Sequence, residues 1–104
     1  MSEKPVMGFA WYDAATFEQF REAMPDMSDS YEDWREGAHR DVRRAEGQGY
    51  RVIRIAMRPT EFFGWCREHG IALPGLQARR QFAADRARLV VRGERAGRRS
   101  FFPF

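Results

Sequence analysis

Hydrophobic positions follow two different spacings along the chain, and the change of spacing predicts the secondary structure. Two short apolar runs, residues 5–12 (PVMGFAWY) and 50–57 (YRVIRIAM), are rich in aromatic or β-branched residues and predict β-strands. Elsewhere, apolar residues recur every three or four positions, as they do on one face of an α-helix. The order of these segments predicts a compact α+β domain with the sequence β-α-α-β-α-α.

A first helix is expected directly after the first strand. Asp13 is placed to cap it, and Phe17 and Phe20 would lie on its buried face. Pro25 cannot continue a helix and restricts the residue before it, so the helix should end near Ala23.

A second helix is expected to begin after Asp29 or Ser30, since either side chain is a good N-cap. Its end is set by the glycines at positions 47 and 49. Its apolar stripe has intervals of three and four residues and consists of Tyr31, Trp34, Ala38, Val42 and Ala45.

A third helix is expected to begin at Pro59, a residue favoured at the first helical position. Gly70 is placed to end it in the left-handed conformation. Ile71 would then close on Cys66 or Trp65 in a Schellman arrangement.

A fourth helix should begin near Leu76, and its end has two interpretations. An unbroken helix-forming run favours a helix that reaches Arg92. Alternatively, residues 89–91 form a strand that turns through residues 93–97 into residues 100–102, giving a C-terminal β-hairpin. The sequence leaves both open.

Charge is strongly polarised along the chain. Residues 1–36 carry nine acidic residues against three basic ones, whereas residues 77–104 carry eight arginines against two acidic residues. Such a chain either pairs its own ends or presents a basic face to an acidic partner. We assign residues 1–92 to the α+β domain and residues 93–104 to a basic, aromatic C-terminal segment that could dock on it.

Composition narrows the class of protein further. The chain has 104 residues, a net charge of only +3 and a single cysteine, which excludes an internal disulfide. No apolar stretch is long enough for a signal peptide or a membrane span, so we expect a cytoplasmic protein with no membrane partner. The strong excess of arginine over its one lysine indicates a GC-rich bacterial or phage genome.

The order of several short motifs resembles that of a set of small uncharacterised bacterial proteins. The matching residues are Tyr31 and Trp34, Trp65 and Cys66, Gly70, and Ala78 with Arg79. The resemblance covers residues 6–90. It implies a small α+β domain and carries no implication for activity.

Cys66 and His69 are the one pair that suggests catalysis, because residues three apart share a helix face. The preferred interpretation is a buried thiol beside Trp65. The C-terminal end of a helix is its negative end, which disfavours a thiolate. No glycine-rich nucleotide-binding motif occurs, and we expect no cofactor, no metal site and no catalytic residues.

Arg79 and Arg86 lie seven positions apart, on nearly the same side of the fourth helix, among apolar residues. Buried arginines must be paired or must line an opening. They either pair with acids of the first two helices or stack on Trp34 or Trp65, or they form a pocket for a carboxylate or phosphate.

The C-terminal segment mixes cations with aromatic rings, a composition found in protein hot spots and in single-stranded nucleic-acid sites. We therefore expect a small non-enzymatic binding or regulatory protein that acts on an acidic partner protein, of the antitoxin, immunity or phage-encoded inhibitor type. The alternatives are nucleic-acid binding through the same region and, third, an enzyme that uses Cys66. The predicted partner-binding residues are Arg79, Arg86, Arg95, Arg98, Arg99, Phe101, Phe102 and Phe104.

Overall fold

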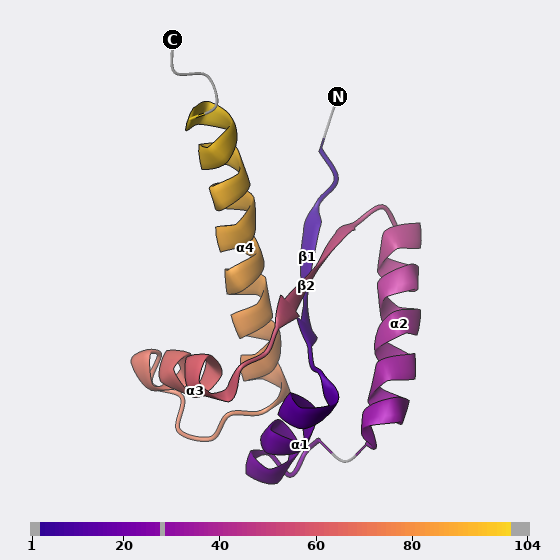
Figure 1. The fold of residues 1–104 in the computed structure, drawn as a ribbon, viewed down its shortest axis with the longest axis vertical. Helices are drawn as coiled ribbons and strands as arrows, with labels where there is room; N and C mark the ends of the chain where they lie inside the picture. Colours follow the sequence, from indigo (N-terminus) through magenta and orange to yellow (C-terminus); the bar gives the residue numbers. More distant parts are fainter. Residues whose placement is uncertain (1–2, 28, 101–104) are drawn as a thin grey trace.

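The computed structural model of the protein describes residues 3–27 and 29–100, the last three by their backbone alone. It is a compact α+β domain in the predicted β-α-α-β-α-α order (Figure 1). The elements are β1 (Val6–Trp11), α1 (Ala14–Ala23), α2 (Tyr31–Gly47), β2 (Arg51–Ala56), α3 (Pro59–Glu68) and α4 (Leu76–Ser100).

The two strands form a parallel sheet, with Val6 opposite Arg51 and Trp11 opposite Ala56. Helices α1 and α2 make the crossover that parallel strands require. The sheet stands between α4 on one face and α2 on the other (Figure 1). Gly8 faces α4, whereas Trp11 faces α2.

The core is largely aromatic. Phe20 of α1, Phe62 of α3 and Phe82 of α4 pack in a row, and all three rings are almost completely buried. Phe62 lies 5.5 Å from Phe20 and 5.5 Å from Phe82, between ring centroids. One cluster of rings therefore joins three helices that are distant in the sequence.

Two of the residues predicted to cap helices, Asp13 and Ser30, do so in the structure. The Asp13 carboxylate accepts a hydrogen bond of 2.8 Å from the Thr16 backbone N–H, and the Ser30 hydroxyl accepts one of 3.1 Å from Asp33. Ser30, not Asp29, is thus the cap of α2.

The Schellman closure of α3 is also confirmed. Gly70 has a left-handed φ of 68°, and the Ile71 N–H donates to the Cys66 carbonyl at 2.9 Å. This bond turns the chain back toward the core, where Ile71 packs.

The alternative prediction of a C-terminal hairpin is wrong for the part of the chain that the structure describes. Residues 89–97, which the hairpin would have used for a strand and a turn, continue α4. A Cβ at Gly93 or Gly97 would meet no atom within 4 Å, and a glycine inside a helix costs about 1 kcal/mol relative to alanine, which α4 tolerates at both positions. Two ion pairs hold this end of α4: Arg51 binds Glu94 at 2.6 Å, and Arg95 binds Glu3 at 3.5 Å.

Helices long and apolar enough to cross a lipid bilayer are absent from residues 3–27 and 29–100.

Candidate protein-docking cleft

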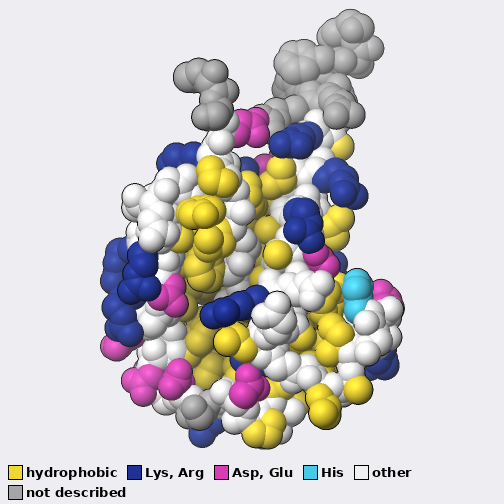
Figure 2. Space-filling model, turned by 180° about the vertical axis from the view of Figure 1, so that it is seen from behind, with side chains coloured by type: hydrophobic (Ala, Val, Ile, Leu, Met, Phe, Trp, Pro, Cys, Tyr) yellow, Lys and Arg dark blue, Asp and Glu magenta, His cyan; other side chains and the backbone are white. Residues whose placement is uncertain are grey.

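A cleft of about 1280 Å³ lies between α2 and α4, with β1 along its floor. Figure 2 shows this face: a band of hydrophobic side chains runs down it, flanked by charged side chains. The cleft is larger than the ~300–1,000 Å³ typical of small-molecule pockets. A polypeptide is therefore a better match for its size than a metabolite.

The α4 wall of the cleft is basic. Besides Arg79, which is buried, it presents four exposed arginines: Arg80, Arg88, Arg92 and Arg95. Arg88 pairs with Asp85 of the same helix, and Arg95 pairs with Glu3. Arg80 and Arg92 have no ion-pair partner among the described residues, so both charges remain available to a ligand.

The α2 wall carries mainly acidic residues. Asp33, Glu36 and Asp41 line the cleft together with Arg40. Asp41 forms an exposed i,i+3 pair with Arg44 at 3.5 Å. The acidic residues of α2 and the basic residues of α4, which are separated along the sequence, thus face each other across one cleft.

The floor of the cleft is the outer edge of β1. The described part of the chain forms a two-stranded sheet, so β1 has β2 on one side and the cleft on the other. Met7 and Phe9 add half-buried apolar side chains to this floor. The cleft thus combines backbone, apolar surface and charge.

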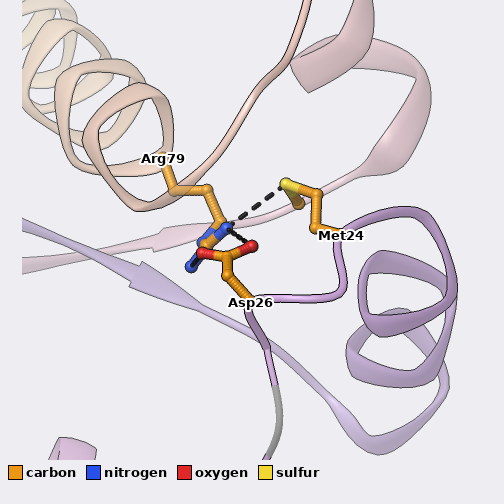
Figure 3. Close-up of polar contacts among 3 residues, drawn as sticks. All are labelled: Met24, Asp26 and Arg79. Carbon is orange, nitrogen blue, oxygen red and sulfur yellow. Dashed lines mark hydrogen bonds and ion pairs between the residues drawn. The ribbon is translucent and has the colours of Figure 1, made fainter.

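Arg79 does not offer its charge to a ligand, because Asp26 already binds it. The guanidinium donates to both Asp26 carboxylate oxygens, at 3.2 and 2.9 Å, and to the Met24 sulfur at 3.3 Å (Figure 3). Only 7% of Arg79 is exposed. The pairing that the sequence suggested is present, but the acid comes from the loop after α1.

The pKa values of two groups in or beside this ion pair, Asp26 and Tyr12, are shifted. The hydrogen bond from Arg79 lowers the pKa of Asp26. Nearby Tyr12 is buried, and loss of solvent raises its pKa to about 12 although the charge of Arg79 opposes the shift. At the base of the cleft the charge of Arg79 is therefore already neutralised by Asp26.

Arg86 points to another part of the surface. Its guanidinium lies 5.0 Å from the centre of the Phe82 ring and 4.0 Å from Glu61 of α3. It does not line the cleft, so Arg79 and Arg86 form no joint pocket. The predicted stacking on Trp34 or Trp65 is replaced by this contact with Phe82.

The predicted C-terminal residues are described only in part. Arg95 lines the upper end of the cleft. Arg98 and Arg99 belong to α4 by their backbone, and their side chains lie outside the description. Phe101, Phe102 and Phe104 lie outside the described residues altogether.

The setting of Cys66 does not favour nucleophilic chemistry. Its side chain is buried, and loss of solvent raises the pKa of the thiol. His69 instead stacks on Trp65 at 4.3 Å, and its Nδ1 lies 2.9 Å from the Trp65 carbonyl oxygen. Among the described residues, no three histidine, cysteine or acidic side chains gather as metal ligands would.

Sequence reasoning missed the strand edge and the row of arginines on α4 that faces it. One signal was available for the edge, since Gly8 interrupts an otherwise apolar strand and such a glycine often marks close backbone approach. The arginine row had none, because Arg80, Arg88 and Arg92 look like ordinary solvated helix positions.

Comparison with protein families, curated proteins and solved structures finds no match for this chain.

Proposed function

We propose that this protein is a non-enzymatic binding module that takes an acidic segment of a partner protein into the cleft between α2 and α4. The observation that carries the proposal is the α4 wall, where Arg80 and Arg92 are exposed without ion-pair partners among the described residues. A regulatory role of the antitoxin, immunity or inhibitor type agrees with a small domain of this kind.

Two features of the cleft favour a protein ligand over nucleic acid. Its floor includes apolar side chains, which give energy to protein interfaces. Its α2 wall carries Asp33, Glu36 and Asp41, which would repel a nucleic-acid backbone that is charged at every nucleotide, whereas a polypeptide can carry its acidic residues on the α4 side alone. Nucleic-acid binding through the C-terminal end of α4 is the alternative that the test must separate.

Two glycines provide a matched pair of variants for this test. Gly37 of α2 lines the cleft, whereas Gly64 of α3 does not. A Cβ at either site would lie 3.7 Å from the guanidinium nitrogen of the arginine three residues later. Leucine is a better helix former than glycine, so G37L and G64L should both fold, and only G37L should fill the cleft.

The experiment is affinity capture from an extract of the organism that encodes the protein, with and without nuclease. We expect wild type and G64L to retain the same acidic protein after nuclease treatment, and G37L to lose it. Capture that nuclease abolishes would favour the nucleic-acid alternative. Equal capture by G37L and G64L would place the binding site outside the cleft.

A further inference from the structure

The outer edge of β1 presents a row of backbone groups that no other described segment satisfies. In the parallel ladder the Arg51 N–H donates to the Pro5 carbonyl at 2.8 Å, and the Met57 N–H donates to the Trp11 carbonyl at 2.9 Å. Odd-numbered residues of β1 therefore face β2, because bonding residues alternate along a parallel strand. The N–H and C=O groups of Val6, Gly8 and Ala10 point the other way, into the cleft.

The cleft has the length of a strand. The lining part of α4 runs from Leu76 to Arg95, which is about 29 Å at 1.5 Å per residue. The six residues of β1 span about 20 Å along the same direction. An extended segment laid along β1 would thus stay within the cleft over its whole length.

The walls also specify which side chains such a segment should carry. Side chains of an added strand would point alternately toward α4 and toward α2. On the α4 side they would meet Arg80, Arg88 and Arg92, which favour acidic residues. On the α2 side they would lie beside Met7 and Phe9 and face the acidic wall of Asp33, Glu36 and Asp41, so apolar side chains fit there and acidic ones do not.

A second copy of this chain fits the edge less well. Antiparallel pairing of β1 with itself keeps equivalent helices on the same face of the joined sheet, so α4 would lie beside α4. The arginine row would then face its own copy, and Asp33, Glu36 and Asp41 would face theirs. Like charges placed in this way oppose association.

We propose that the partner binds by strand addition: an extended segment with alternating acidic and apolar residues pairs with the outer edge of β1. This inference rests on the proposed function, since it specifies how the acidic partner occupies the cleft. Main-chain hydrogen bonds to Val6, Gly8 and Ala10 would supply affinity, and the α4 arginines would select the acidic face.

The probe for the test is a synthetic peptide of alternating glutamate and valine, about as long as β1, with blocked ends and a fluorescent label. Its control has the same composition with the glutamates in one block. Two further versions carry N-methyl groups on alternate amides, one set on the glutamates and the other on the valines. Binding is followed by fluorescence anisotropy.

Strand addition predicts that one N-methylated set abolishes binding and the other preserves it, because only alternate amides face β1.

V6P removes an outward N–H without touching the bonds to β2, so affinity should fall about fivefold, the value of one hydrogen bond. An R80Q/R92Q double variant should lose about tenfold or more, while R43Q, on an exposed part of α2 outside the cleft, should bind normally.

The outcomes separate the two proposals. If the arginine variant weakens binding but V6P and both N-methylated sets do not, the cleft binds acidic protein without strand addition, and this inference is overturned alone. Strand addition by a partner is likewise overturned if the alternating peptide and the control with its glutamates in one block bind equally. It is also overturned if the free protein is a dimer that V6P dissociates. If neither R80Q/R92Q nor G37L affects any binding, the proposed function fails as well.

Discussion

Gly8 of β1 and Ala83 of α4 are so close that a side chain at position 8 would collide with the helix backbone. A Cβ built on Gly8 would lie 2.3 Å from the Ala83 carbonyl oxygen and 2.8 Å from the Ala87 Cβ. This close approach brings α4 directly over β1. It also fixes the distance between the arginine wall and the strand edge.

The first prediction follows from this contact. G8A should lower the free energy of unfolding by about 1–3 kcal/mol, because the obstructing atom is backbone and cannot rotate away. G37A is the control, since its Cβ would meet only the flexible end of Arg40 at 3.7 Å. That variant should be stabilised by up to about 1 kcal/mol. Urea unfolding measures both, and a G8A midpoint at or above wild type would contradict the packing of α4 on β1.

The Arg79–Asp26 pair predicts a specific acid dependence of stability. The pKa of Asp26 is lower in the folded protein than in the unfolded chain, so its contribution is present above the unfolded pKa of about 3.9. It is lost as the pH falls through the folded pKa. Because Asp26 is partly exposed, we expect D26N to cost about 1 kcal/mol at neutral pH.

Urea unfolding of wild type and D26N across the acidic range tests this pair. The difference between them should shrink as the pH falls below about 4. A difference that stays constant with pH would show that the carboxylate charge of Asp26 does not contribute.

Tyr12 predicts a corresponding effect at alkaline pH. Burial raises its pKa in the folded state to about 12, above the ordinary value of 10.0. The neutral ring therefore stabilises the fold below pH 10, and this contribution is lost as the pH rises toward 12. In an ultraviolet titration of the folded protein, the tyrosine transition that Y12F removes should lie well above pH 10, near 12. A removed transition close to pH 10 would contradict the burial of Tyr12.

Cys66 should be unreactive while the protein is folded. Its side chain is buried, and the pKa of the thiol is raised, so little thiolate forms at neutral pH. Labelling with a thiol reagent should be at least about a hundredfold slower than in the denatured chain, since it requires opening of the core. Labelling at the denatured rate would restore the hypothesis of a Cys66 enzyme.

Local signals were sufficient to predict most of the fold. Asp13, Ser30, Pro59 and Gly70 each act on their own neighbours, and the structure places every one of them at the end of a helix. The end of α4 was ambiguous because Gly93 and Gly97 resemble turn residues. Tertiary contacts decided it, including the pair between Arg51 and Glu94, which are 43 positions apart.

The cleft could not be predicted in the same way. The sequence identified an acidic N-terminal part and a basic C-terminal part, but not that α2 and α4 would face each other across the edge of β1. Nor did it show that Asp26 would bind Arg79, because that acid lies in a loop with no periodicity to orient it. Both depend on how the elements pack.

Amide hydrogen exchange along β1, read residue by residue by NMR, is the most direct test of an open strand edge in the cleft. In the free protein, the amides of Met7, Phe9 and Trp11 bond to β2 and should exchange at least about a hundredfold more slowly than the outward amides of Val6, Gly8 and Ala10. The alternating peptide should then slow the outward set. Equal protection of both sets in the free protein would contradict the account, because the outer edge of β1 would already be occupied.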